Sequence, residues 1–223
     1  MRLLVISGGR HPYEESTPVL DAFLKRAGHD VSVHWTTEIL TADSIIDNFD
    51  VLIFNTLRIG ETSFTLPERD VIESFISSGK GFICIHISGC GQESWPEYRD
   101  ITGGGWDMRK SFHPPFGGFT VNIQGDDHPV VEGISDFVTQ DELYMGIEYL
   151  KGNQVLMSAT SEEGTYVWRG KETYMPSATF PLGWTRKYGD GKVFVILLGH
   201  NALSFQTPEF QKVILNGISW ITN

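Results

Sequence analysis

The sequence predicts an α/β fold in which a mainly parallel sheet carries helices on both of its faces. Over the first 90 residues, short apolar runs alternate with segments of helical periodicity, and short turns join them. The expected strands are Leu3–Ser7, Val31–Trp35, Val51–Asn55 and Gly81–Ile87, and the expected helices are Thr17–Ala27, Ala42–Phe49 and Pro67–Ser78. Strand–helix–strand units of this kind form right-handed crossovers between parallel strands.

The strand Gly81–Ile87 is expected at the centre of this sheet. It is an apolar run bounded by glycine, which is typical of a strand covered on both faces. Side chains alternate between faces along a strand, so Phe82 and Cys84 should point to one side and Ile83 and Ile85 to the other. His86 then lies at the carboxyl end of the strand, where open α/β sheets bind their ligands.

The rest of the chain predicts an antiparallel extension and a lid within one domain, residues 1–223. An irregular segment rich in glycine, proline and aromatic residues begins at residue 93, and the insert or lid is expected at about 93–150. Within it we expect a strand at Phe119–Gln124 and a loop at Val138–Tyr149. Two hairpins should follow, with strands at Gln154–Thr160 and Thr165–Arg169, then at Leu182–Tyr188 and Lys192–Leu198. The last expected element is a helix at Pro208–Ile221.

Composition narrows the class of protein. The 223 residues carry 17 Lys and Arg against 28 Asp and Glu, a net charge of −11, which argues against a nucleic-acid or anionic-membrane partner. No apolar run reaches the roughly 18 residues that a membrane span needs. The apolar stretch at the N-terminus is too short for the hydrophobic region of a signal peptide and fits a first strand. We therefore expect a cytoplasmic protein. An apolar sheet edge would make a homodimer unsurprising.

Three apolar strands each lead into a histidine, and this is the main functional signal. Leu3–Ser7 precedes His11, Gly81–Ile85 precedes His86, and Val193–Leu198 precedes His200. If these strands are parallel, the imidazoles converge on one edge, where neutral imidazoles could bind a divalent cation such as Zn²⁺. The ligands expected are His86, His113 and His200, with His11 either replacing His113 or contacting the substrate. The alternative is that each histidine is a hydrogen-bonded structural residue.

Other residues complete the predicted site. Asp141 and Glu142 are candidates for proton transfer together with His86. Trp106, Trp184 and Tyr144 lie in or beside loops of the expected rim, where aromatic faces suit a sugar ring. These aromatic residues could instead pack the lid onto the body. Gly103–Gly105 neither follows a strand nor opens a helix, so no nucleotide cofactor is expected.

The cysteines suggest a different enzyme. Only Cys84 and Cys90 are present, and their spacing matches neither a metal knuckle nor a redox motif. Cys84 should be buried within the strand, whereas Cys90 follows the strand end. Cys90 could serve a thiol hydrolase, although the sequence reveals no base paired with it.

Five stretches of the chain, taken together and in this order, resemble the trehalose-utilisation (ThuA-like) family: GKGFICIH, WPEYRDITGGGWDMRKSFHPP, HPVVEGISDFVTQDELYMG, PLGWTRKYGDGKVFVILLGH and TPEFQKVILNGISWI. The resemblance implies a flavodoxin-like sheet of the class I glutamine amidotransferase-like superfamily. His86 would occupy the place of the catalytic cysteine of amidotransferases, which removes that mechanism. The family-typical positions are His86, His113, Asp141, Glu142, Trp184 and His200.

These observations and the resemblance lead to one functional expectation and two rivals. We expect an enzyme of carbohydrate metabolism that acts on a sugar or oxidised sugar, and a divalent metal held by the histidines could assist it. The first rival is the Cys90 thiol hydrolase. The second is a non-catalytic sugar-binding or regulatory module, which would bind sugar without turning it over.

Overall fold

One large sheet organises the molecule. The computed structural model describes residues 1–11, 13–41, 45–91, 94–125 and 127–223, and places nine strands of this part of the chain in one sheet. In sheet order these are β2 (Asp30–His34), β1 (Arg2–Gly9), β3 (Val51–Leu57), β4 (Gly81–Ile85), β13 (Gly191–Ile196), β12 (Thr179–Tyr188), β9 (Gln154–Thr160), β6 (Gly117–Ile123) and β7 (Phe137–Asp141). The strands from β2 to β13 are parallel, and those from β12 to β7 continue antiparallel. The predicted mainly parallel sheet with an antiparallel extension is confirmed.

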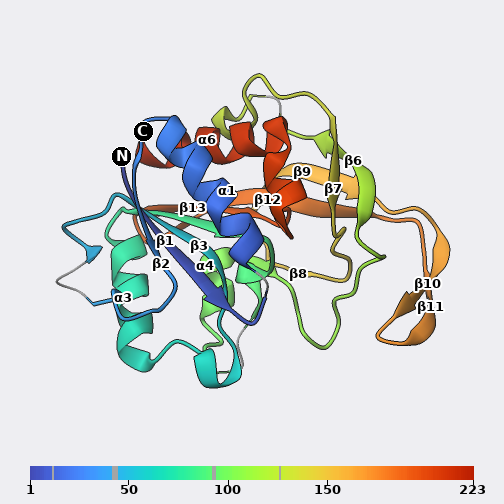
Figure 1. The fold of residues 1–223 in the computed structure, drawn as a ribbon, viewed down its shortest axis with the longest axis horizontal. Helices are drawn as coiled ribbons and strands as arrows, with labels where there is room; N and C mark the ends of the chain where they lie inside the picture. Colours follow the sequence, from blue (N-terminus) through green and yellow to red (C-terminus); the bar gives the residue numbers. More distant parts are fainter. Residues whose placement is uncertain (12, 42–44, 92–93, 126) are drawn as a thin grey trace.

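Helices cover both faces of the parallel part (Figure 1). One face packs against α1 (Tyr13–Arg26), α5 (Ala202–Gln206) and α6 (Pro208–Thr222), and the other against α3 (Leu66–Ser77) and α4 (Tyr98–Thr102). Each face of the sheet has its own hydrophobic core. The strands β1, β3, β4 and β13 contribute side chains to both cores, because successive side chains point to opposite faces. The predicted arrangement of helices on two sides is therefore confirmed.

Strand β4 shows why the sheet is stable at its centre. Ile83 and Ile85 belong to the core under α6, whereas Phe82 and Cys84 belong to the core under α3, as the alternation predicts. All four side chains are fully buried. Burial of an aliphatic or aromatic side chain of this size contributes about 1.5–3 kcal/mol, so β4 is a major source of stability.

The N-terminal helices follow from local sequence, with one shift in position. Helix α3 begins after Thr65, whose backbone N–H donates to the Glu68 carboxylate in a capping box. Helix α1 begins at Tyr13, four residues before the prediction, so that Glu14 and Glu15 occupy its first turn, where acidic side chains favour the helix dipole. Of the helix expected at Ala42–Phe49, residues 42–44 lie outside the described residues.

The second half of the chain departs further from the predictions. The loop expected at Val138–Tyr149 begins instead with the edge strand β7, whose residues alternate between buried and exposed as they pair with β6. The expected hairpin of Gln154–Thr160 with Thr165–Arg169 is wrong, because β9 pairs with β12 and β6. Strand β10 (Gly164–Trp168) pairs instead with β11 (Lys171–Met175), which was not predicted. Local turn residues cannot reveal a partner strand that is distant in sequence.

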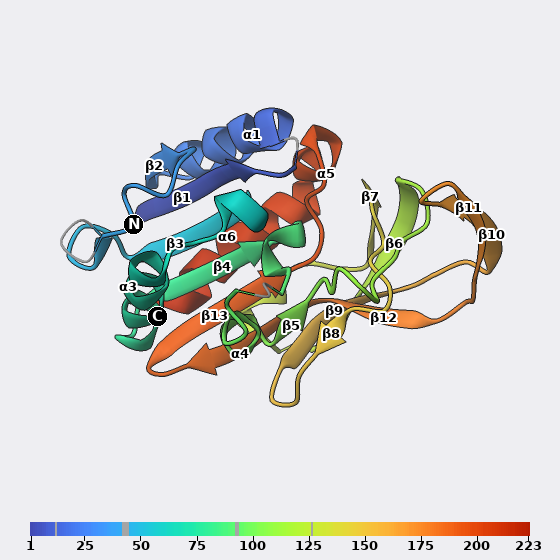
Figure 2. The ribbon, with the colours of Figure 1, turned by 90° about the horizontal axis from the view of Figure 1, so that it is seen from below.

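The β10–β11 hairpin lies at the end of the molecule opposite α3 (Figure 2). The short α5 was also not predicted; it begins after Asn201, whose side-chain oxygen accepts from the backbone N–H groups of Leu203 and Ser204. Two further two-residue strands, β5 (Gly104–Gly105) and β8 (Glu148–Tyr149), pair within the predicted insert. No described helix has the length and apolar character needed to cross a membrane. The prediction of one domain with an insert at about 93–150 stays a prediction.

Candidate functional site

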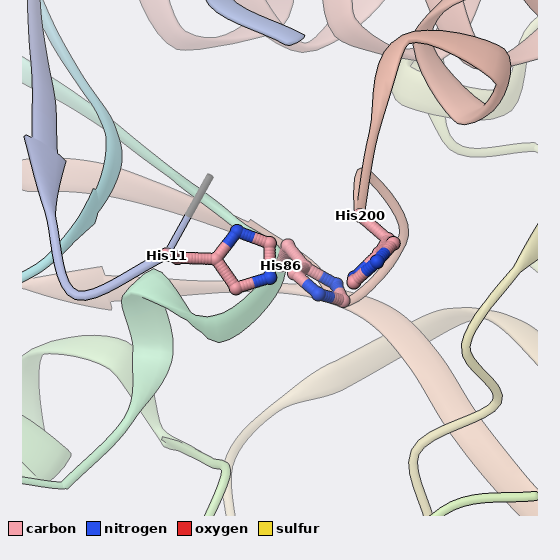
Figure 3. Close-up of side chains that lie close together, drawn as sticks. All are labelled: His11, His86 and His200. Atoms are coloured by element: carbon pink, nitrogen blue, oxygen red, sulfur yellow. The ribbon is translucent and has the colours of Figure 1, made fainter. Parts of the chain in front are cut away.

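The three strand-end histidines meet at one edge of the sheet. His11 follows β1, His86 directly follows β4, and His200 follows β13. Strand β3 separates β1 from β4, yet the centroids of the three rings lie only 4.9–5.4 Å apart in every pairing. One ring nitrogen from each histidine lies within 4.8 Å of the others (Figure 3). The expected convergence of His11, His86 and His200 is observed.

The backbone turns sharply at two of these histidines. Strand β4 ends at Ile85, so His86 lies outside the strand that was predicted to run to Ile87, and it adopts a left-handed conformation with φ 54°. Gly199, which precedes His200, has φ 118°, and a Cβ there would lie 2.7 Å from the Ile85 side chain. Only glycine tolerates this combination, and the turn aims His200 back across the strand ends.

Both ring nitrogens of His86 are hydrogen-bonded, and the ring is fully buried. Nδ1 lies 2.9 Å from the carbonyl oxygen of Leu197, which can only accept, so Nδ1 carries the hydrogen. Nε2 is then the acceptor for the Tyr144 hydroxyl, at 2.5 Å. This tautomer follows from the hydrogen-bond partners.

The Glu142 carboxylate lies close to ring nitrogens of three histidines. Its carboxylate lies 3.2 Å from Nδ1 of His200, 3.6 Å from Nε2 of His86 and 3.5 Å from Nε2 of His113. The side chain is 14% exposed. Glu142 is therefore a mostly buried acid that faces three imidazoles.

Asp141 has a different environment from its neighbour. Its fully buried carboxylate accepts hydrogen bonds from the backbone N–H groups of Gly199 (2.7 Å), Glu142 (2.8 Å) and His200 (3.3 Å). These contacts join the end of β7 to the turn that carries His200. The geometry makes Asp141 a residue that positions Glu142 and His200, rather than one that exchanges protons with a ligand.

The charges in the cluster follow from burial and from Glu142. Burial, assisted by the neighbouring imidazoles of His86 and His200, lowers the pKa of His11 to about 3. Burial opposes the charge of Glu142, but contacts with His200 and His86 outweigh it and hold the pKa of Glu142 well below its usual range. Burial also lowers the pKa of His200, but the Glu142 carboxylate more than offsets this and raises it overall. At neutral pH the cluster therefore holds an ionised Glu142 and a neutral His11.

His113 and its aromatic neighbours form a wall beside the histidines. Burial lowers the pKa of His113. Its ring lies 4.5 Å from Trp168, 5.7 Å from Trp106 and 5.8 Å from Tyr144. His113 is not part of the compact group that could hold a metal, because it reaches Glu142 from another side. His11 takes its place in that group.

Two aromatic residues expected at the rim have their polar groups inside the protein. Trp184 is fully buried, and its indole N–H donates to the Thr102 carbonyl at 2.8 Å, so it packs in the core under α4 and does not face the histidines. Tyr144 is 1% exposed, and its hydroxyl is held by His86. The expectation that these side chains contact a substrate therefore does not fit the geometry. Trp106 is also nearly buried, but it borders a cavity.

Trp168 also belongs to this wall, although its sequence context gave it no predicted role in the site. It precedes the Arg169–Gly170 turn of the β10–β11 hairpin, and pairing with Lys171 places its ring against His113. The signal that could have found it is the short Arg-Gly turn between two β-prone segments, which predicts a hairpin with Trp168 beside its tip.

Neither cysteine has the environment of a nucleophile. Cys90 is 1% exposed and Cys84 is fully buried, and burial raises the pKa of each thiol to about 12. The thiolate is the nucleophilic form, so both thiols should be inert at neutral pH. The rival proposal of a Cys90 thiol hydrolase gains no support from this geometry.

The fold and the site together define a class of protein. It is an α/β protein of flavodoxin-like type, with His86 at the turn after β4 and three strand-end histidines at one edge of the sheet. The family model for trehalose utilisation, ThuA, matches residues 2–221. The chain therefore belongs to the ThuA family, and this membership supports a role in carbohydrate metabolism.

Solved structures agree with the family. A protein described as ThuA-like from Parabacteroides merdae ATCC 43184 is 20% identical, with a TM-score of 0.79 over 100% of this chain and 89% of the other. A second, from Bacteroides uniformis ATCC 8492, is 18% identical, with a TM-score of 0.75 over 99% and 91%. A cytoplasmic protein of Salmonella typhimurium LT2 is 16% identical, with a TM-score of 0.67 over the full length of both chains. At these identities the likeness shows the fold. No curated protein matches the chain at a significant level.

Proposed function

We propose that the protein is an enzyme that acts on a sugar or an oxidised sugar at the histidine cluster, with a divalent cation held by His11, His86 and His200. The observation that carries the proposal is the approach of three ring nitrogens, from three separate strand ends, to within 4.8 Å of one another. Three imidazoles are a common ligand set for catalytic zinc, and they bind it in the neutral form. His200, whose pKa Glu142 raises, would therefore release its ring proton on binding the cation.

The donor set fits a cation in two further respects. The lowered pKa of His11 keeps its ring in the neutral, ligating form at neutral pH. Its Nδ1 atom has no hydrogen-bond partner among the described residues, so no contact there prevents Nδ1 from carrying the ring hydrogen and leaving the lone pair on Nε2. A bound cation would supply Lewis acidity, polarising a carbonyl or hydroxyl group or lowering the pKa of a water toward about 7.

The residues around the cluster account for the other parts of the proposed reaction. Glu142 is ionised and faces the histidines, so its carboxylate is placed to accept a proton at the cluster. Its lowered pKa makes it a weak base, so the proton would have to come from a group that is itself acidified, as a hydroxyl or a water on a cation would be. Asp141 positions Glu142 through its backbone N–H. His113 contacts the opposite carboxylate oxygen of Glu142 at 3.5 Å and limits the directions in which that acid can turn.

A cavity reaches the aromatic wall at Trp106. It has a volume of about 470 Å³, and Arg99, Asp107 and Glu148 are also among its lining residues, whereas the cluster histidines and Glu142 are not, so it is a neighbouring region for part of a bound ligand and not the reaction centre. The Arg99 guanidinium pairs with the Glu148 carboxylate at 2.5 Å, so this wall offers polar groups without a large net charge. An aromatic ring with balanced polar groups fits a neutral polyhydroxyl ligand better than a strongly charged one. A cytoplasmic location is part of the proposal, supported by the description of the Salmonella protein.

Metal analysis combined with turnover tests this proposal. Protein purified without chelator should contain about one equivalent of a divalent metal and should convert at least one member of a panel of sugars and keto-sugars. His86→Ala should lose both the metal and the activity. His34→Ala, at the end of β2, is the control because its side chain bonds locally to Ser32. Absence of bound metal, together with unchanged sugar turnover in His86→Ala, would refute the proposal.

A further inference from the structure

Tyr144 occupies the one atom of His86 that a cation would need. Nδ1 of His86 carries a hydrogen that it donates to the Leu197 carbonyl, so its lone pair is not free for a ligand. Nε2 has the remaining lone pair, and the Tyr144 hydroxyl donates to it at 2.5 Å. A nitrogen lone pair can accept this hydrogen bond or bind a cation, but it cannot do both.

The surroundings of Tyr144 hold its hydroxyl in this position. The side chain is 1% exposed, and its ring lies 4.5 Å from the rings of both His86 and Trp106. A buried hydroxyl without a partner is costly, and water does not reach this position readily. The hydrogen bond to His86 is therefore the state that the protein favours when His86 has no other ligand.

We propose that Tyr144 is a latch, whose hydroxyl competes with a divalent cation for Nε2 of His86 and so sets the affinity of the histidine cluster for metal. This inference rests on the metal role in the proposed function. Tyr144 acts here as a positioning residue, since it holds His86 in one tautomer and orientation until the latch opens. This role explains why Tyr144, which was expected at the rim, is buried too deeply to bind a substrate.

Tyr144→Phe tests the latch, because it keeps the ring and removes the hydroxyl. We expect chelator-stripped Tyr144→Phe to bind Zn²⁺ about three- to tenfold more tightly than the wild type, which corresponds to the net contribution of one hydrogen bond. The affinity is measured by competition with a chromophoric chelator. Tyr98→Phe is the matched control: Tyr98 is equally buried, and its hydroxyl donates to the Ser88 carbonyl rather than to a histidine. Its zinc affinity should equal that of the wild type.

The outcomes separate the latch from the metal role itself. Tighter binding by Tyr144→Phe supports both, and binding by Tyr144→Phe but not by the wild type supports the latch while removing the metal from the proposed function. Zinc binding by Tyr144→Phe that is equal to or weaker than that of the wild type overturns the latch and leaves the metal role intact. Weaker binding would indicate that the Tyr144 hydroxyl is itself a zinc ligand. If neither protein binds zinc, both proposals fail.

A measurement on the wild type covers the case in which Tyr144→Phe does not fold. The buried hydroxyl proton of Tyr144 should give a slowly exchanging downfield NMR signal in the metal-free protein, because it is hydrogen-bonded to an imidazole. This signal should shift or disappear as zinc saturates the site. A signal unchanged at saturating zinc would overturn the inference.

Discussion

Nδ1 of His200 lies 3.2 Å from Oε2 of Glu142, although the two residues come from opposite parts of the sheet. Glu142 follows β7 at the outer edge of the antiparallel extension, and His200 follows the central strand β13. Asp141 joins them. Its carboxylate accepts hydrogen bonds from the backbone N–H groups of Gly199 and His200, and Glu142 is the next residue in the chain. The antiparallel extension thus delivers an acid to a histidine cluster built by the parallel strands.

Glu142→Gln should lower the pKa of His200. Burial alone lowers that pKa, and the Glu142 carboxylate is what raises it. An NMR titration of the His200 ring in metal-free protein measures the change. Turnover of any substrate found should fall about 10²-fold or more, because the proton acceptor is lost. Glu209→Gln, in the first turn of α6, controls for the loss of one negative charge. An unchanged His200 titration would contradict this account of the pair.

The same pair should leave a signature in the pH dependence of stability. Because the folded pKa of His200 is raised, its contribution is fully present below the unfolded value of about 6.5 and is lost as pH rises through the folded pKa. Since the pair is partly exposed, the effect should be about 1 kcal/mol or less. The free energy of unfolding of Glu142→Gln should therefore fall less than that of the wild type as the pH rises from 6 to 9.

His11→Gln should make the protein more tolerant of mild acid. The folded pKa of His11 is lowered to about 3, so the unfolded chain takes up a proton below about pH 6.5 while the folded chain does not. Wild-type stability from this group is therefore lost as pH falls from about 6.5 toward 3. Allowing for solvent screening, we expect a difference on the order of 2 kcal/mol between pH 7 and pH 4. Urea unfolding of metal-free protein at both pH values, with His34→Gln as control, measures it; parallel losses in all three proteins would refute the prediction.

Asp141→Asn should destabilise the fold and loosen the site. In the wild type the carboxylate accepts from three backbone N–H groups. The amide keeps one acceptor oxygen, but its NH₂ group is a donor and would face a backbone N–H that also needs an acceptor. We expect a loss of about 1–3 kcal/mol in the free energy of unfolding, together with weaker zinc binding, because Gly199 and His200 are released. Asp136→Asn is the control: that carboxylate also accepts a backbone N–H, from Ile123, but on the surface, so its effect should be much smaller. Equal effects of the two substitutions would show that Asp141 has no special role.

Cys90→Ser should leave sugar turnover unchanged. The thiol is buried, and burial raises its pKa to about 12, so its thiolate fraction at neutral pH is minute. Alkylation of Cys90 by iodoacetamide in the folded protein should be roughly 10²-fold slower than that of a free cysteine, or slower still. Rapid alkylation with loss of activity would restore the thiol hydrolase as the better hypothesis.

Much of the parallel half could be predicted because its signals are local. Apolar runs, helix periodicity and glycine ends mark β1, β3, β4 and α3 within a few residues. The alternation along Gly81–Ile85 assigns each side chain to its face, and the position of His86 after that run places it at the ligand-binding edge. The resemblance to the ThuA family rests on the same local stretches and is confirmed over residues 2–221.

The antiparallel half was harder to predict because strand partners there are distant in sequence. Nothing near Gln154–Thr160 indicates that it pairs with Thr179–Tyr188 and Gly117–Ile123 rather than with the next strand. The polar sequence of Phe137–Asp141 resembles a loop, and it forms a strand only because β6 pairs with it.

By itself, the sequence determined the alternating α/β order, the apolar centre of the sheet and the placement of three histidines after strand ends, since each of these depends on neighbours within a few residues. The tertiary structure decided which side chains meet: His11 rather than His113 joins the compact cluster, Glu142 faces it, Tyr144 holds His86, and Trp184 turns into the core. Those contacts depend on strand order and on the direction of single rings, which chain spacing does not encode.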